Sequence, residues 1–346
     1  MLDSPDAIRS LDSRDMLGTI EQMSRHLAEG VKRGRMAGIP RYRPSNIVVC
    51  GMGGSAIGGD LLAEWLRHTS DIPCFVRRSY SASNMVGKDS LVIVSSYSGN
   101  TEETMSMLED ARRRGAKIVA ISSGGRIAEM GSAAGIPVAR VPNGFVPRAS
   151  LGFLLGAMIG ILEKSGVVDP TQELEEAAKV LDETAASCAP DIATQRNPAK
   201  RLAHEIFGTI PVVAGHGLSA PVARRWANQL NENGKILAFS TEIPEMNHNE
   251  IVGWMRDGRC QGFSVIVLEH DERHAPMHRR VNATKAMIAR RTGVFSVHGS
   301  GTLPLTQMLS LVMVGDYVSA YLGILRKEDP SSTEPINELK SILSEK

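Results

Sequence analysis

Short apolar runs rich in β-branched residues alternate with longer segments of helical spacing in the first half of the chain. The apolar runs begin at Asn46 (NIVVCG), Cys74 (CFV), Ser90 (SLVIVSS), Lys117 (KIVAIS) and Ile136 (IPVARV). Segments such as EETMSMLEDARRRG, which begins at Glu102, separate them. This alternation is typical of βαβ units, so it predicts an α/β fold with a parallel sheet.

A second series of apolar runs follows. These runs begin at Ile210 (IPVVAGH), Lys235 (KILAFS), Gly262 (GFSVIVLEH) and Gly293 (GVFSVHG). The first run of each series ends in the pattern V-V-x-G-x-G-x-S-A, which starts at Val48 and again at Val212, and each copy leads into a helical segment of similar length. We interpret the match as an internal duplication of one open α/β domain, with a chance match of one strand and turn as the alternative.

The segments outside the two series are predicted to be helical. Residues 151–163 indicate a buried helix, residues 303–330 a long helix ended by Asp329-Pro330, and the stretch from Ile336 a short amphipathic helix. The predicted organisation is an N-terminal helical segment (1–40), a first α/β domain (41–168), a helical linker (169–205), a second α/β domain (206–326) and a C-terminal helical segment (327–346).

The composition narrows the class of ligand. The 346 residues are 42% hydrophobic, which is enough apolar material for two buried cores. The net charge is +1 and only 4% of residues are aromatic, so a small or anionic metabolite is expected rather than nucleic acid. The four cysteines form no CxxC pair and no basic leader precedes an apolar run, so we predict reduced thiols in a cytoplasmic protein. The apolar run at 151–163 is too short to cross a bilayer, and no membrane partner is expected.

Hydroxyl side chains gather where the third apolar run ends, in the stretch SSYSGNTEETM from Ser95. In an open parallel sheet ligands bind beyond the carboxyl ends of the strands, and a helix is predicted to begin there at about Thr101. The helix N-terminus, Ser96, Ser98 and Thr101 all suit the oxygens of a phosphate. A turn and cap built from the same residues, without any ligand, is the alternative.

The glycine-rich stretch GMGGSAIGGD, residues 51–60, is predicted to be the turn between the first strand and the first helix. Small residues there would let a ligand approach the backbone. Ser55 and the hydroxyl cluster would then line one crevice, whose expected size suits a monophosphate. The stretch also fits a dinucleotide fingerprint, G-x-G-x-x-A, and Arg77 and Arg78 would then suit NADP. Both interpretations stay open at this point.

Three histidines, His270, His274 and His278, recur at intervals of four residues. On one helix face this spacing would suit a metal ion. Pro276 interrupts the run, so a polar loop that enters a helix near Pro276 is the favoured interpretation.

Four stretches together resemble one known family: GMGGSAIGGD, SSYSGNTEET, FVPRASLG and NQLNENGK with NHNEI. In this order they are similar to the bifunctional phosphoglucose/phosphomannose isomerases, which are built from two sugar-isomerase (SIS) domains. The resemblance implies two flavodoxin-like SIS domains of αβα layering, with Gly53, Gly54, Ser55, Ser96, Ser98 and Thr101 around the substrate's phosphate. It implies reversible isomerisation of glucose 6-phosphate and mannose 6-phosphate to fructose 6-phosphate, as in glycolysis and gluconeogenesis, with no cofactor and no metal.

The resemblance also implies roles for single residues. Glu232 matches the family's catalytic glutamate, which moves a proton between C2 and C1 through a cis-enediol. His248 matches a ring-opening histidine that comes from the neighbouring subunit, so a homodimer is expected. Lys340 matches a C-terminal lysine that assists ring opening, on a helix that closes on the active site.

Two further residues complete the expected site. Arg148 is the preferred cation for the enediolate charge, and a surface arginine is its alternative. Thr333 fits the small hydroxyl position linked to acceptance of both C2 epimers, although this chain has DPSSTEPI where the family's stretch is closer to DPTPVEPI. Beside the isomerase, a non-catalytic sugar-phosphate sensor, a glucosamine-phosphate isomerase and an NADP-dependent dehydrogenase remain as alternatives.

Overall fold

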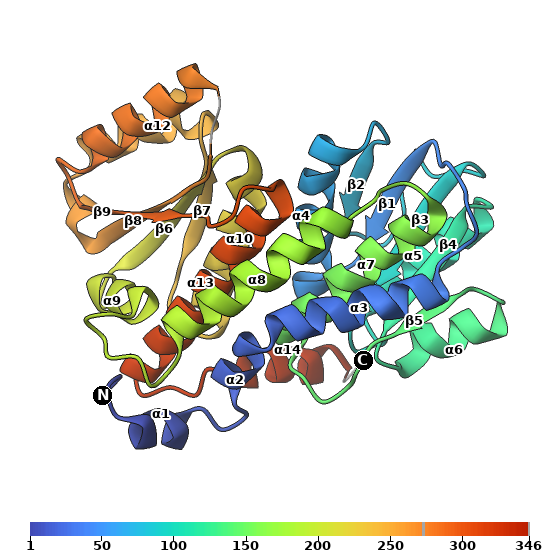
Figure 1. Cartoon of the computed structure of the whole chain (residues 1–346), viewed down its shortest axis with the longest axis horizontal. Coiled ribbons are helices and arrows are strands. Elements are labelled where there is room, and N and C mark those ends of the chain that lie inside the picture. The colour runs from blue at the N-terminus through green and yellow to red at the C-terminus, as the bar shows by residue number, and fades with distance from the viewer. Residues whose placement is uncertain (272–273, 345–346) are drawn as a thin grey trace. The chain divides into compact units, whose positions relative to one another are not determined.

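The computed structural model describes residues 1–271 and 274–344, shown in Figure 1. Contacts within the chain group it into two compact units. Unit 1 comprises Met1–Glu21, Glu183–Gly299 and Leu311–Lys346, and unit 2 comprises Gln22–Asp182 and Ser300–Ser310. The N-terminal helical segment and the helical linker are thus each divided between the units.

Unit 2 is built on a five-stranded sheet in the order β2-β1-β3-β4-β5, and each adjacent pair is parallel. The strands are β1 (Asn46–Cys50), β2 (Cys74–Arg77), β3 (Ser90–Ser95), β4 (Lys117–Ser122) and β5 (Val138–Arg140). Each of the five apolar runs of the first series therefore coincides with a strand, as predicted, and β2 extends one residue beyond its run. Ile47 lies between Cys74 and Leu91 in the register, and β1 and β3 form the buried centre of the sheet.

Helices of unit 2 cover both faces of this sheet (Figure 1). They are α3 (Met23–Ala37), α4 (Gly53–Thr69), α5 (Glu102–Arg113), α6 (Gly125–Ala133), the 3-10 turn η1 (Pro147–Ser150), α7 (Leu151–Ser165) and α8 (Thr171–Cys188), which runs on into unit 1. Side chains alternate along the strands, so Val92 and Val94 pack with Met107 and Leu108 of α5 in one core cluster. The predicted buried helix at 151–163 is confirmed as α7.

Helices α3 and α7 meet along a seam of glycines. A Cβ atom added to Gly34 would lie 2.1 Å from the carbonyl oxygen of Ala157, and one added to Gly156 would lie 2.3 Å from that of Leu27. Because neither position has a side chain, the two backbones approach to contact. Close backbone packing thus fixes α3 against the sheet's covering helix α7.

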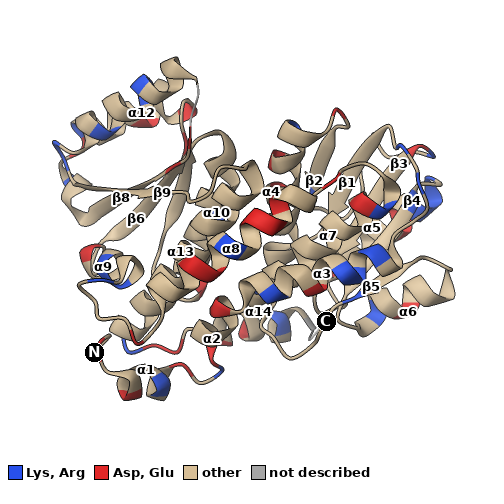
Figure 2. Cartoon of the chain, viewed as in Figure 1, with Lys and Arg blue, Asp and Glu red and all other residues tan. Residues whose placement is uncertain are grey.

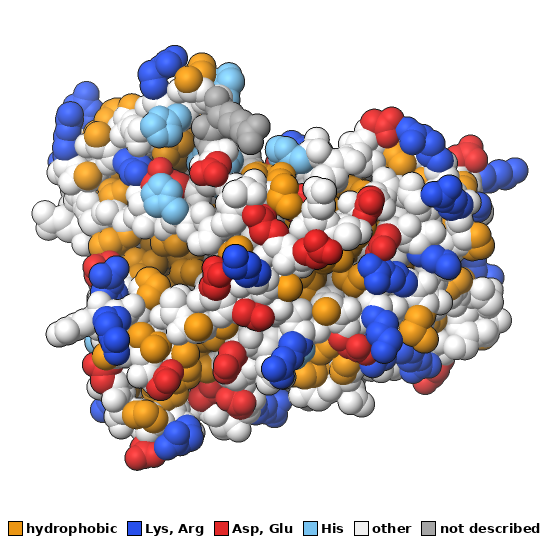
Figure 3. All heavy atoms as spheres, in the orientation of Figure 1, with side chains coloured by type: hydrophobic (Ala, Val, Ile, Leu, Met, Phe, Trp, Pro, Cys, Tyr) orange, Lys and Arg blue, Asp and Glu red, His pale blue; other side chains and the backbone are white. Residues whose placement is uncertain are grey.

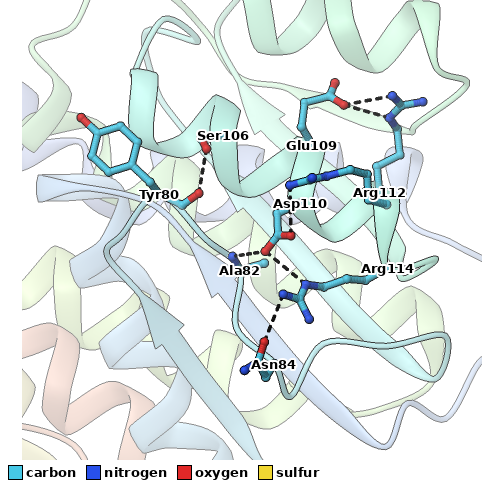
Figure 4. A network of polar contacts seen from close by, with 9 residues as sticks. Tyr80, Ala82, Asn84, Ser106, Glu109, Asp110, Arg112 and Arg114 are labelled. Atoms are coloured by element: carbon cyan, nitrogen blue, oxygen red, sulfur yellow. Dashed lines mark hydrogen bonds and ion pairs between the residues drawn. The ribbon is translucent and has the colours of Figure 1, made fainter.

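The loop between β2 and β3 is held on α5 by a polar network, shown in Figure 4. The buried carboxylate of Asp110 accepts from the backbone N–H of Ala82 at 3.0 Å and pairs with Arg114 at 3.1 Å. Arg114 also donates to Asn84 at 3.2 Å. The network fixes the loop that leads into β3, at whose end the hydroxyl cluster lies.

Unit 1 contains a second parallel sheet, in the order β7-β6-β8-β9. Its strands are β6 (Ile210–Gly215), β7 (Phe239–Glu242), β8 (Phe263–Glu269) and β9 (Gly293–His298). The order repeats the β2-β1-β3-β4 arrangement of unit 2, as a duplication requires. The run KILAFS was expected to be a strand from Lys235, and this expectation is wrong: Lys235 has φ +53, outside the β region, and the strand begins four residues later.

The helices of unit 1 pack around this sheet and along the chain ends. They are α1 (Pro5–Leu11), α2 (Met16–Glu21), α9 (Pro198–Glu205), η2 (Gly217–Ser219), α10 (Ala220–Glu232), η3 (Glu245–His248), α11 (Glu250–Arg256), η4 (Gly258–Gly262), α12 (Ala275–Ile288), α13 (Pro304–Leu325), whose residues up to Ser310 belong to unit 2, and α14 (Glu334–Ser344). Arg225 of α10 forms a buried bidentate ion pair with Asp316 of α13, at 3.1 and 2.6 Å. This pair anchors α10, whose last residue is Glu232.

The distribution of surface charge and the apolar character of α13 both bear on possible partners. Lys and Arg alternate with Asp and Glu over the visible elements of each unit in Figure 2. In the described chain, α13 is long and apolar enough by length and composition to span a membrane, and 89% of its most apolar window is buried inside the structure. Such burial is typical of the core helix of a folded domain.

Candidate functional site

In unit 2 the strand order reverses between β1 and β3, and both strands end beside the glycine-rich stretch and the hydroxyl cluster. Ligands of open α/β sheets bind at this switch point. A Cβ atom on Gly51 would lie 2.9 Å from the carbonyl oxygen of Ser95, so the ends of the two strands are in close contact. The sequence prediction that the two motifs share one edge of the sheet is confirmed.

The glycine-rich stretch was expected to be a turn, and most of it is helix. Helix α4 begins at Gly53, so its later glycines lie inside the helix, where Gly59 packs on Val49. Gly53 has φ +50, and beyond its chain neighbours and the backbone of α4 no described atom lies within 4 Å of a Cβ built there. No described side chain caps the α4 N-terminus at Met52. An exposed helix N-terminus beside open space suits an anion.

The predicted hydroxyls are arranged around this point. Ser55, 6% exposed, accepts from the N–H of Tyr97 at 3.3 Å, and buried Ser96 lies 3.0 Å from the hydroxyl of Thr101. Thr101 is the N-cap residue of α5, as predicted, but its hydroxyl bonds to Ser96 instead of capping the helix. Ser98 is exposed and accepts from the N–H of Asn100 at 3.3 Å.

Sequence reasoning missed the part played by Tyr97 and by the end of β4. Tyr97 donates its hydroxyl to the carbonyl of Pro142 at 3.0 Å and accepts from the N–H of Phe145 at 3.0 Å, and burial raises its pKa. Ser123 donates to the carbonyl of Tyr97 at 2.7 Å. The serines of SSGG, which follow β4, were the available signal. Tyr97 thus ties the hydroxyl loop to the segment that leads to Arg148.

Arg148 is not a surface arginine, because it is only 2% exposed. It lies in η1, and its backbone packs on the start of α4, since a Cβ on Gly54 would lie 3.2 Å from the Cα of Arg148. The structure therefore brings Gly53, Gly54 and Arg148 together. In the same place the buried hydroxyl of Ser95 has no hydrogen-bond partner among the described residues.

Unit 1 carries the remaining predicted residues. Glu232 is half-buried at the last position of α10, and His248 is exposed at the end of η3. The backbone carbonyl of Thr333 accepts from the N–H groups of Ile336 and Asn337 at 3.1 Å, at the start of α14. Lys340 is exposed within α14.

A lysine that sequence reasoning did not single out connects two of these places. The ammonium of Lys235 donates to the carbonyl of Glu232 at 2.5 Å and to that of Ser332 at 3.0 Å. The structure thus brings the end of α10 together with the segment just before Thr333. The only sequence signal was the position of Lys235 at the end of NQLNENGK.

The structure bears on two alternative interpretations of the sequence, a histidine metal site and an NADP site. Helix α12 begins at Ala275, so His270 and His274 precede it and the three histidines do not share a helix face. Within residues 1–271 and 274–344 no group of three or more His, Cys, Asp or Glu could hold a metal ion. Figure 3 shows histidine side chains on the surface around α12. Arg78, which the NADP hypothesis would use, forms an ion pair with Asp60.

The two parallel sheets, each with a small-residue turn after its first strand, define a protein with two SIS-type domains. Comparison with family models agrees: residues 42–132 match the SIS domain, and residues 195–343 match the bacterial phospho-glucose isomerase C-terminal SIS domain. The predicted fold class is confirmed. A hypothetical protein from Thermus thermophilus has the same fold, with a TM-score of 0.74 at 16% identity over 98% of this chain and 93% of that one.

Curated relatives identify the family. A bifunctional phosphoglucose/phosphomannose isomerase from Caldicellulosiruptor bescii is 39% identical over 303 residues, which cover 86% of this chain and 89% of the relative. One from Aquifex aeolicus is 38% identical over 300 residues, with 86% and 90% covered. The chain belongs to the bifunctional phosphoglucose/phosphomannose isomerase family.

Proposed function

We propose that this protein is an aldose–ketose isomerase that converts glucose 6-phosphate and mannose 6-phosphate reversibly to fructose 6-phosphate. The observation that carries the proposal is 39% identity to a bifunctional phosphoglucose/phosphomannose isomerase over nearly the whole length of both chains. The geometry of unit 2 supports it, because hydroxyls and an uncapped helix N-terminus lie at the switch point of the sheet.

The phosphate group is assigned to the α4 N-terminus and the hydroxyl cluster. Gly53 and Gly54 let the phosphate approach the backbone, while Ser55, Ser96, Ser98 and Thr101 offer hydrogen bonds to its oxygens. Arg148, buried beside Gly54, supplies a fixed positive charge for the enediolate. A buried guanidinium that is already in place needs little reorganisation when negative charge develops.

Glu232 is assigned as the base. A carboxylate that faces C1 and C2 takes the proton from one carbon and returns it to the other through a cis-enediol, so no redox change is needed. His248 and Lys340 open the sugar ring beforehand, and Thr333 leaves room for both C2 epimers. Helix α14, which carries Lys340, closes on the bound sugar.

The chain is proposed to work as a homodimer in which His248 serves the partner's site. Support comes from exposed apolar side chains on both sides of His248 in the sequence: Leu237 is 65% exposed, Phe239 53% and Val252 63%. Burying such side chains against a second copy is favourable.

The first experiment is a coupled assay with fructose 6-phosphate that reads glucose 6-phosphate and mannose 6-phosphate separately, with and without a chelator. Both products are expected at unchanged rates in chelator. Glu232→Gln should lower kcat by about 10²–10⁴-fold, as expected for loss of a general base. Glu205→Gln is the matched control, since Glu205 is the last residue of α9, and its kcat should stay at the wild-type value. Normal turnover by Glu232→Gln would refute the base assignment.

Mixing two inactive variants tests the shared site. Glu232→Gln and His248→Ala protomers, unfolded together and refolded, should form mixed dimers with one intact site each. Random pairing then restores about a quarter of wild-type activity, because half the dimers are mixed and each has one of two sites intact. No recovery, with dimers present by sedimentation, would place His248 in its own subunit's site.

A further inference from the structure

The side chain of Lys235 joins the end of α10 to the segment that precedes α14. Its ammonium donates to three backbone carbonyls, those of Glu232 at 2.5 Å, Ser332 at 3.0 Å and Pro330 at 3.4 Å. An ammonium has three protons, and these carbonyls are acceptors for all of them. Both ends of the contact belong to unit 1.

The backbone of Lys235 is left-handed, with φ +53. Glycine is the usual residue at such a position just after a helix, because it has no Cβ to strain the backbone. The chain has glycine one residue earlier, at Gly234, and lysine at the left-handed position itself. The hydrogen bonds of the Lys235 side chain hold lysine at a position where the backbone alone would favour glycine.

The proposed mechanism gives a role to each of the two segments that Lys235 joins, the end of α10 and the start of α14. Glu232, whose carbonyl accepts from Lys235, is the proposed base, and Asn233 next to it is fully buried against Ser319, its amide 3.0 Å from that hydroxyl. On the other side, residues 334–343 of α14 are all exposed, including Lys340. The segment before α14 is therefore the place where this helix is held.

We propose that Lys235 is a positioning residue that fixes the pivot of α14 relative to Glu232. This inference rests on the proposed function, since it concerns the site of Glu232 and Lys340. The ammonium holds the carbonyls of residues 330 and 332 against the end of α10, so that α14 moves from one defined point. Lys235 itself does not touch the substrate.

The test compares Lys235→Gly with Lys327→Gly. Both lysines have left-handed backbones, at φ +53 and φ +62, and Lys327 is exposed beyond the end of α13. Glycine relieves the backbone strain at both positions. In Lys235→Gly this gain offsets the loss of the ammonium's hydrogen bonds, because Lys235 is only half-buried and water can reach the site, so both variants should melt close to the wild type. Lys235→Gly should lose about tenfold to a hundredfold in kcat with KM within about threefold, because misplaced reacting groups cost rate more than binding. Lys327→Gly should keep the wild-type values.

A double-mutant cycle with Lys340→Ala shows whether Lys235 acts through α14. The double variant Lys235→Gly/Lys340→Ala should turn over at nearly the rate of Lys340→Ala alone, since a pivot has no effect once the group it positions is gone. Lys235→Arg, which keeps a charged N–H donor for these carbonyls, should recover part of the lost kcat.

Three results would overturn the inference: wild-type kcat in Lys235→Gly, a raised KM at unchanged kcat, or losses that multiply independently in the double variant. A kcat loss that follows a lower melting temperature and that Lys235→Arg does not recover would also count against it. Failure of the proposed function is distinguishable, because it would appear as full turnover in Glu232→Gln.

Discussion

Gly34→Ala is expected to destabilise unit 2, although alanine favours helices more than glycine does. The new Cβ would lie 2.1 Å from the carbonyl oxygen of Ala157, whereas a carbon–oxygen contact is normally about 3.3 Å. Helices α3 and α7 must therefore separate by about 1.2 Å, and a gap of about 0.5–1 Å already forfeits a quarter to a half of the dispersion attraction.

The magnitude follows from two opposing terms. Overpacking costs about 1–3 kcal/mol, and the upper end applies because the obstacle is backbone and cannot rotate away. Alanine returns about 1 kcal/mol of helix propensity. The net loss is about 2 kcal/mol, which for a unit of about 150–250 residues lowers Tm by about 4–8 °C.

Thermal unfolding followed by far-UV circular dichroism measures this loss, and a second variant and a control sharpen the measurement. Gly156→Ala meets the carbonyl of Leu27 at 2.3 Å and should behave like Gly34→Ala. Gly58→Ala, at a buried position in α4, meets its nearest neighbour, a Leu151 methyl, at 3.5 Å, an ordinary contact. Its Tm should stay level or rise. A Tm of Gly34→Ala at or above that of the wild type would refute the packing argument.

Two further predictions concern buried polar groups. His26 is stacked on Phe153 and burial lowers its pKa, so its unfolded state binds protons more readily and stability should fall as pH drops below about 6.5. In His26→Phe the Tm should depend less on pH between 7.5 and 5.5, and an unchanged dependence would contradict this. Lys200, fully buried, donates to the carbonyls of Leu2, Pro190 and Ile192 at 2.7–2.8 Å. Lys200→Met should cost about 2–5 kcal/mol in urea unfolding, because it strands these acceptors.

The sequence predicted the sheets well because strand periodicity is local. Both series of apolar runs were found, and the one misplaced strand, β7, begins later than predicted because the chain is still turning after the end of α10 at the first residues of KILAFS. Ile236 donates its N–H to the carbonyl of Leu230 across that turn, a contact that depends on the left-handed backbone of Lys235 and not on the apolar pattern of KILAFS. The glycine-rich stretch was taken for a turn since glycine usually breaks helices, whereas here it allows α4 to pack closely on β1.

The candidate site was predictable only in part, for a related reason. Ser55, Ser96 and Thr101 stand at strand ends, where fold class alone indicates a ligand. Tyr97 and Lys235 act through contacts with residues far along the chain, at Pro142 and Ser332, and no spacing rule connects such pairs. Their parts emerge only when the chain is folded.

The turns after β1 and β6, the two copies of the duplicated motif, allow a last test of where the phosphate binds. Their glycines Gly53 and Gly217 have similar backbone conformations, but different groups lie beside them. Gly53 has φ +50 and Gly217 has φ +46, so alanine should strain both equally, by about 1 kcal/mol. Beyond its chain neighbours and the backbone of α4, no described atom lies within 4 Å of a Cβ on Gly53, whereas the ring of His270 lies 3.4 Å from one on Gly217 and stacks on His216.

The space beside Gly53 is thus open, whereas the His270 ring lies beside Gly217. With the phosphate at the open copy, as proposed, Gly53→Ala should raise KM for fructose 6-phosphate while Gly217→Ala leaves KM unchanged at a similar loss of Tm. A wild-type KM in Gly53→Ala would remove the phosphate from the turn after β1, and a raised KM in Gly217→Ala alone would place the phosphate in the second domain.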